Sequence, residues 1–293
     1  MRESDASLAQ CQRLQARLRQ RMERLYPLQD FALTIPGAPT PYSIALPADP
    51  YAPLDRLAEE MAAGHAPTPS EPVGDAAAVA RQSLASGTHL PYWALLWPSG
   101  MALAEALLAR PEVVRRRRVL ELGCGLGVTA IAALACGAEL CVSDVFAEAL
   151  LFCRYNTLRN AGRTPRTLPA SWRTHVGRDA CRALGPFDVV LAADVLYEDE
   201  DREPLAQWAP RLLAPQGVFW LAEPGRRASG AFVAERRAAG WRDETTLYER
   251  TWPPEDKSVA VTVHRFDGLA AQDGTWDGSD RGPAAKPRGY PKR

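Results

Sequence analysis

The chain has 293 residues, enough to bury a substantial core in one large domain with extensions or in two small domains. Its 35 basic and 35 acidic residues balance, so no overall electrostatic field favours nucleic acid or a membrane surface as a partner. The six cysteines include no C-x-x-C pair and the four histidines are scattered, which argues against a metal site.

The first 85 residues are expected to form an N-terminal extension, partly helical and partly irregular. Apolar residues recur at steps of three and four, which predicts an amphipathic helix over residues 8–25: Leu8, Cys11, Leu14, Leu18, Met22 and Leu25. Its apolar face packs on the same domain or binds a partner. Prolines recur between residues 27 and 53 and again in 66–75, which predicts irregular chain. The N-terminus lacks the apolar run of a secretory signal, and no segment has the length of a membrane span, so we expect a soluble cytoplasmic protein.

From about residue 86 apolar runs alternate with helix-length segments, a pattern typical of an α/β fold with a largely parallel sheet. We expect strands at 118–122, 140–143, 187–192 and 218–222, and helices at about 127–136, 147–160, 203–213 and 228–239. No helix separates 242–250 from 258–266, which predicts an antiparallel hairpin. The domain is expected to span 86–267, and the polar residues 268–293 are expected to be a disordered tail.

A glycine-rich segment, Glu121-Leu122-Gly123-Cys124-Gly125-Leu126-Gly127, follows the first of these strands. Glycines between a strand and a helix let a nucleotide-like ligand approach the backbone. The pattern also fits the loose dinucleotide fingerprint, since Asp144 follows 19 residues after Gly125, near the spacing of a ribose-binding carboxylate. Glu121 favours a ligand with a cationic amino-acid end, as in S-adenosylmethionine, over a pyrophosphate. Asp144 is expected to bind ribose hydroxyls, with capping of the next helix as the alternative.

Three further motifs carry a resemblance: Leu96-Trp97-Pro98-Ser99-Gly100, Ser171-Trp172 and Ala193-Asp194-Val195-Leu196-Tyr197. With the glycine segment, residues 88–266 resemble the class I, seven-strand methyltransferases. More narrowly they resemble the protein-lysine methyltransferase branch with an Asp-x-x-Tyr motif, which includes the lysine methyltransferase of the electron-transfer flavoprotein β subunit. The resemblance implies a Rossmann-like seven-stranded, mostly parallel sheet with helices on both faces.

The resemblance also implies S-adenosyl-L-methionine as cofactor and a protein substrate. The composition and spacings lead us to expect no metal, membrane or nucleic-acid partner. The expected cofactor-binding residues are Trp97, Glu121, Gly123, Cys124, Gly125, Asp144, Trp172 and Ala193. Asp194 and Tyr197 are expected to orient an acceptor lysine amine, and Asp194 is a candidate acceptor of its proton. Each aromatic residue could instead be ordinary packing. Residues 223–226, Glu-Pro-Gly-Arg, line the acceptor channel or form a polar loop.

Methyl transfer from a sulfonium needs alignment and desolvation and no catalytic triad. The leading hypothesis is an enzyme that methylates a protein lysine. A small-molecule N-methyltransferase of the same fold, an NAD-binding oxidoreductase and a non-catalytic interaction protein remain as alternatives.

Overall fold

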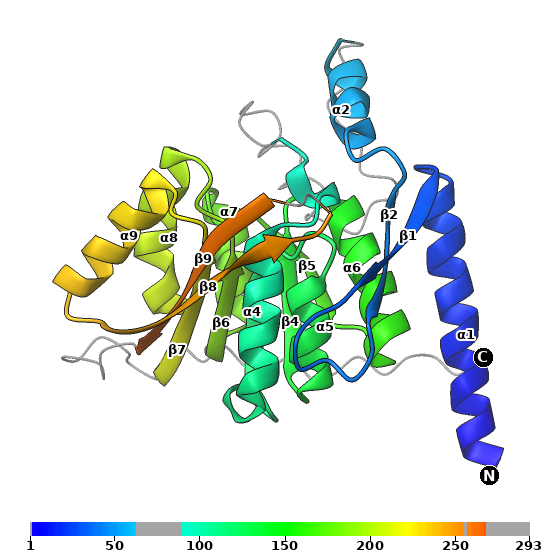
Figure 1. Cartoon of the computed structure of the whole chain (residues 1–293), viewed down its shortest axis with the longest axis horizontal. Coiled ribbons are helices and arrows are strands. Elements are labelled where there is room, and N and C mark those ends of the chain that lie inside the picture. The colour runs from blue at the N-terminus through cyan, green and yellow to red at the C-terminus, as the bar shows by residue number, and fades with distance from the viewer. Residues whose placement is uncertain (1, 63–89, 255–256, 268–293) are drawn as a thin grey trace.

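A seven-stranded sheet forms the centre of the chain, of which the computed structural model describes residues 2–62, 90–254 and 257–267 (Figure 1). The strands are β3 (Arg118–Leu122), β4 (Glu139–Asp144), β5 (Arg166–Pro169), β6 (Phe187–Ala193), β7 (Leu213–Glu223), β8 (Arg242–Trp252) and β9 (Lys257–Asp267). They lie in the order β5-β4-β3-β6-β7-β9-β8. Strands β3 to β7 run parallel, whereas β9 pairs antiparallel with both β7 and β8. The predicted Rossmann-like, mostly parallel sheet with a C-terminal antiparallel hairpin is confirmed.

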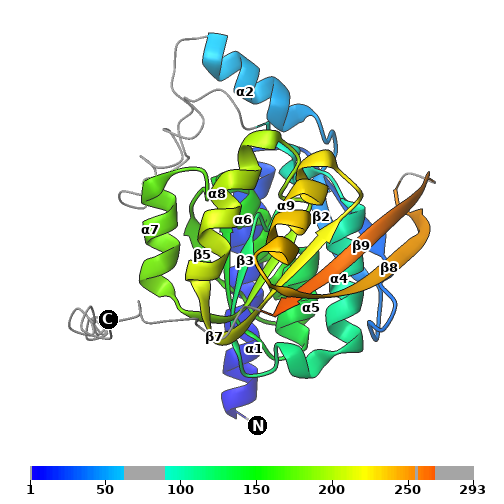
Figure 2. The ribbon, with the colours of Figure 1, turned by 90° about the vertical axis from the view of Figure 1, so that its left-hand side faces the viewer.

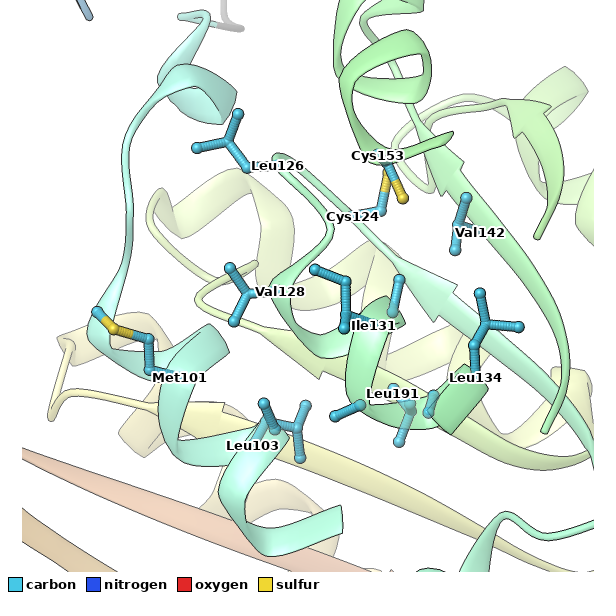
Figure 3. Close-up of a cluster of buried hydrophobic side chains, with 14 of the residues drawn as sticks. Met101, Leu103, Cys124, Leu126, Val128, Ile131, Leu134, Val142, Cys153 and Leu191 are labelled. Carbon is cyan, nitrogen blue, oxygen red and sulfur yellow. The ribbon is translucent and has the colours of Figure 1, made fainter. Parts of the chain in front are cut away.

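Helices cover both faces of this sheet (Figure 2). On one face lie α4 (Pro98–Ala109), α5 (Val128–Ala135) and α6 (Ala147–Ala161), and on the other α7 (His175–Leu184), α8 (Asp199–Leu212) and α9 (Arg227–Ala238). Successive side chains of β3 point to opposite faces of the sheet. Val119 therefore packs in the cluster under α4, α5 and α6, while Leu120 and Leu122 pack in the cluster under α7, α8 and α9. Figure 3 shows part of the first cluster, to which both Ile131 of α5 and Leu191 of β6 belong. Burial on both faces explains why the central parallel strands β3 and β6 are mostly apolar.

The N-terminal segment packs on this domain through α6. It contains α1 (Arg2–Glu23), the antiparallel pair β1 (Leu28–Leu33) and β2 (Tyr42–Pro47), and α2 (Ala52–Ala62). Leu18 and Met22 of α1 are buried in the same core as α6, which confirms the predicted helix and its docking on the same chain. Asn156 of α6 is fully buried; its amide accepts from the Ala45 N–H at 2.8 Å and donates to the Ala45 carbonyl at 3.0 Å. The amide thus pairs with β2 as a neighbouring strand would.

The prediction of irregular chain between residues 27 and 53 was wrong, because β1 and β2 lie there. The prolines stand before β1, between the strands and at the end of β2, where no ladder hydrogen bond needs their missing N–H. The other predicted strands and helices are confirmed within a few residues, whereas α4, β5 and α7 had no predicted bounds. The second proline-rich break, the boundary at 85/86 and the proposed tail from 268 lie outside the described residues.

Among the described helices, none combines the length and the apolar character that crossing a bilayer would require.

Candidate active site

A cavity of about 340 Å³ lies at the carboxyl ends of β3, β4 and β6. The chain leaves β3 toward one face of the sheet and leaves β6 toward the other. A crevice therefore lies between the ends of these neighbouring strands, which is the usual ligand site of open α/β sheets. The cavity is lined by Leu90, Tyr92, Trp93, Trp97, Gly123, Gly125, Asp144, Val145, Phe146, Ser171, Trp172, Ala193, Asp194, Val195, Tyr197, Glu198 and Arg226. Most predicted site residues therefore meet at one place. Glu121 and Cys124 do not line it.

The glycine segment needs glycine at particular positions. Gly127 begins α5 with a φ of +84°, and a Cβ there would lie 2.8 Å from the Cys153 sulfur. Figure 3 shows Cys153 beside Cys124 in this tightly packed region. Gly123 has a φ of +67°, and a Cβ there would lie 3.1 Å from Val195. The loop can thus be tightly curved and closely packed only with glycine at these positions.

Asp144 ends β4 and presents a buried carboxylate to the cavity. Its two oxygens accept the backbone N–H groups of Gly125 at 3.1 Å and Phe146 at 3.0 Å. Burial raises the pKa of Asp144 to about 6, although these N–H donors act in the opposite direction. Asp144 is not the N-cap of α6, which is Phe146; its Oδ1 accepts the backbone N–H of that N-cap residue.

Glu121 and Cys124 lie buried beside the cavity lining. Glu121 is 2% exposed, and its Oε2 has no hydrogen-bond partner among the described residues. Burial, together with the negative charge of Asp144, raises the pKa of Glu121 well above its ordinary value. The Cys124 sulfur lies 4.0 Å from Asp144 Oδ2, and burial raises the pKa of this thiol well above its ordinary value. The unpartnered Glu121 oxygen suits a cationic group more than an anionic one.

Aromatic side chains form one wall of the cavity. Trp97 precedes α4 and its indole N–H donates to the Tyr92 carbonyl at 2.9 Å. The Tyr92 ring lies edge-on to both Trp97 and Tyr197, with ring centroids 6.0 and 5.9 Å away. Trp172 follows β5 and lines the cavity while packing partly on the second hydrophobic cluster. Trp93 is mainly a core residue, buried against Phe152 at 5.0 Å.

Asp194 follows β6 in a left-handed conformation, with a φ of +56°. Its backbone N–H donates to the Ala222 carbonyl at 2.9 Å, which holds this strained residue against β7. Its carboxylate accepts two hydrogen bonds from Arg226, Nε to Oδ1 at 2.6 Å and Nη2 to Oδ2 at 2.9 Å. The same guanidinium lies over the Trp97 ring, 5.8 Å from its centroid. Arg226 therefore lines the cavity, which agrees with the first of the two interpretations of residues 223–226.

Buried polar groups hold the turn between β7 and α9 that carries Arg226. Glu223 Oε2 accepts the Gly225 N–H at 2.6 Å, and its other oxygen lies 3.6 Å from His264 Nε2. His264 Nδ1 in turn lies 3.0 Å from Asp243 Oδ2. These contacts fix the loop between β7 and α9.

Tyr197 lies beside the start of α8, where a second ion-pair group is found. Burial raises the pKa of Tyr197 above its ordinary value, so the phenol remains protonated at neutral pH. The Arg173 guanidinium lies 5.9 Å from its ring and pairs with Asp201 at 2.6 Å and Glu198 at 3.2 Å. Nothing in the local sequence pattern marks Tyr92, Arg173 or Glu198, so these residues were not among the predicted ones.

Residues 92–234 match a protein-family model described as lysine methyltransferase. The electron transfer flavoprotein beta subunit lysine methyltransferase of Xenopus laevis is 34% identical over 142 residues, which cover 46% of this chain and 53% of the relative. The histone-arginine methyltransferase METTL23 of Mus musculus is 29% identical over 181 residues, 61% of this chain and 66% of the relative. The chain thus spans about half the length of the first of these curated relatives.

Solved structures also align with the chain. A Thermus thermophilus 16S rRNA N2 G1207 methyltransferase, solved with AdoMet and guanosine, has a TM-score of 0.48 and 18% identity, covering 82% of this chain and 50% of that one. The strand order and the match to the family model agree with the resemblance that the sequence motifs carry. Residues 92–234 of this chain thus resemble the lysine methyltransferase family, and the sheet has the fold of the class I methyltransferases.

Proposed function

We propose that this chain is an S-adenosylmethionine-dependent methyltransferase that transfers a methyl group to the amine of a protein lysine. One observation carries the proposal: the glycine segment, Asp144 and the Asp194–Tyr197 motif, far apart in sequence, line a single cavity. The matched family's description supports a lysine acceptor. The relatives' names include both lysine and arginine methyltransferases, so the acceptor chemistry is tested separately below.

The residues present fit the cofactor. The tightly curved glycine segment lets a ligand approach the backbone, and Asp144 can accept hydrogen bonds from ribose hydroxyls. The unpartnered, buried Glu121 oxygen favours a ligand with positive charge. Trp97 and Trp172 would contact its flat and apolar parts, beside Gly123, Cys124, Gly125 and Ala193. When bound, S-adenosylmethionine supplies a methyl group on a positively charged sulfur, which an acceptor lone pair displaces directly.

The acceptor side is assigned to Asp194 and Tyr197. A carboxylate has about four lone-pair sites, and Arg226 uses one on each oxygen of Asp194, so Asp194 can still accept an N–H from an amine. The Tyr197 hydroxyl would accept a second N–H and so direct the nitrogen lone pair. We assign Asp194 this orienting role rather than that of a base, because Arg226 already holds both oxygens. Tyr92 and Trp97 would exclude water from the reacting groups.

Labelled methyl transfer tests the proposal. S-adenosylmethionine with a labelled methyl group is incubated with the protein and a cell extract of the source organism. Label is expected in protein bands and, after acid hydrolysis, in methyl-lysine. Label in small molecules alone would favour the small-molecule N-methyltransferase, and no transfer by a protein that binds S-adenosylhomocysteine would favour a non-catalytic interaction protein. Calorimetric binding of NAD without binding of S-adenosylhomocysteine would favour an oxidoreductase.

The compartment is proposed to be the cytoplasm. Its support is that all six cysteines are free thiols, which is usual for proteins of a reducing compartment.

A further inference from the structure

The carboxylates that line the cavity already have partners. Asp194 is bound on both oxygens by Arg226, and Asp144 accepts two backbone N–H groups. Glu198 pairs with Arg173 and accepts a backbone N–H of α8 in a capping box. Binding of a cationic side chain favours a carboxylate whose negative charge is not already neutralised by another cation, and a guanidinium needs a bidentate partner. The acceptor side of the described cavity offers no carboxylate in that state.

Arg226 cannot easily be displaced from Asp194. The Asp194 side chain is only 5% exposed, so it would become a buried, unpaired charge if the guanidinium left. One face of Arg226 lies on Trp97, and the turn at its base is fixed by the Glu223–Gly225 hydrogen bond. The charged and titratable groups that face Arg226 are Asp194, Tyr92 and Glu223. A lysine ammonium could not reproduce the two parallel hydrogen bonds of a guanidinium.

We propose that Arg226 is a specificity-determining residue: by committing Asp194 to an ion pair, it makes the acceptor site bind an uncharged amine and reject a guanidinium. A lysine amine, with an ordinary pKa of about 10.4, can shed its proton on entering such a site, whereas an arginine side chain remains charged. Only the uncharged amine has the lone pair that methyl transfer needs. This inference rests on the proposed function, because it assumes that the acceptor enters beside Asp194.

The experiment uses two side-chain surrogates, 1-aminobutane for lysine and butylguanidine for arginine. Their binding to the full-length protein saturated with S-adenosylhomocysteine is measured by ligand-observed NMR between about pH 7.5 and 9.5, within the range where the amine is mostly protonated. S-adenosylhomocysteine carries no sulfonium charge, so any discrimination against cations reflects the protein. For the wild-type protein, the affinity for 1-aminobutane is expected to rise about tenfold per pH unit, in step with the neutral fraction. Butylguanidine is expected not to bind.

Variants at position 226 assign the effect to Arg226. In Arg226→Gln the freed Asp194 carboxylate should accept cations, so the affinity for 1-aminobutane loses its rise with pH and butylguanidine binds. Arg226→Lys keeps the positive charge at position 226, so its affinity for 1-aminobutane should still rise with pH. The matched control is Arg227→Gln, since the neighbouring Arg227 side chain is 85% exposed and pairs with Asp199 away from the cavity lining. It should behave as the wild-type protein does.

Several outcomes would overturn the inference. The first is that the affinity of the wild-type protein for 1-aminobutane does not rise with pH. The second is that the wild-type protein binds butylguanidine, and the third is that the affinity of Arg226→Gln for 1-aminobutane rises with pH as in the wild-type protein. If Arg226→Gln does not fold, the inference is still tested by the binding of 1-aminobutane and of butylguanidine to the wild-type protein, and by the pH dependence of Arg226→Lys. Failure of the proposed function is distinguishable, because it would appear as no binding of S-adenosylhomocysteine or no labelled protein before any amine is added.

Discussion

Replacing Asp144 with alanine tests the cofactor side of the cavity. The Asp144 carboxylate accepts the N–H groups of Gly125 and Phe146, one on each oxygen, and its remaining lone pairs can accept ribose hydroxyls. Hydrogen bonds to a charged acceptor in a buried site are worth about 1.5–3 kcal/mol. Asp144→Ala should therefore weaken binding of S-adenosylhomocysteine by about 10- to 150-fold.

Isothermal calorimetry measures this affinity, and Glu139→Gln is the matched control. Glu139 begins the same strand, β4, at its exposed end away from the cavity, so removing its charge should leave the affinity unchanged. If Asp144→Ala bound S-adenosylhomocysteine within about twofold of the wild-type protein, the ribose would have to lie elsewhere and the reasoning would be refuted.

The pH dependence of the same binding reports the charge of Asp144. Its pKa of about 6 in the folded protein means that the carboxylate is lost as the pH falls through this value. Wild-type affinity should fall below about pH 6, while that of Asp144→Ala should be flat in this range. Because the folded pKa lies above the ordinary 3.8, ionised Asp144 destabilises the fold above pH 6, and protonation relieves this cost. Loss of affinity at low pH would thus not reflect unfolding through Asp144.

Three further variants test the acceptor side and the packing. Asp194→Asn should lower turnover tenfold or more, about 1.4 kcal/mol, with S-adenosylhomocysteine affinity nearly unchanged; lost affinity with normal turnover at saturating cofactor would move Asp194 to the cofactor side. Gly127→Ala should lower the free energy of unfolding by about 3 kcal/mol in chemical denaturation, because its Cβ would meet the Cys153 sulfur; the control Gly162→Ala, also left-handed but with open space around it, should lose only about 1 kcal/mol. Equal losses would contradict the packing argument. Asn156→Ala, which leaves buried groups of β2 and Leu126 without their partner, should cost about 3 kcal/mol, and a loss below that of the more exposed Asn160→Ala would argue against a strand-like role for the amide.

The N-terminal segment shows how far local patterns can mislead. Prolines between residues 27 and 53 predicted irregular chain, yet β1 and β2 pair with each other there, and Asn156 and Asn160 of α6 bind the backbone of β2. These partners lie more than 100 residues away in the sequence. A pattern read over a short window contains no information on such a partner. The β2 side of this pairing lies outside the match to the family model, which begins at residue 92.

The sequence by itself predicted the sheet and several residues that line the cavity. The apolar runs, the glycine segment and Asp144 are local signals, because strand burial, backbone curvature and a carboxylate at a strand end each depend on adjacent residues. Trp97, Asp194 and Tyr197 were recognisable only through motifs that resemble a known family.

Only the tertiary structure showed that Arg226 pairs with Asp194 in the cavity. Arg226 lies 32 residues after Asp194 on the next strand's loop, and the sequence left it as a channel residue or a polar loop. The parallel pairing of β6 with β7 brings the two loops to one edge, where the guanidinium takes both oxygens of Asp194 and the face of Trp97. The charge state of a site depends on which groups meet in space, since an ion pair neutralises a carboxylate only at contact distance, and that meeting is set by the packing of the strands.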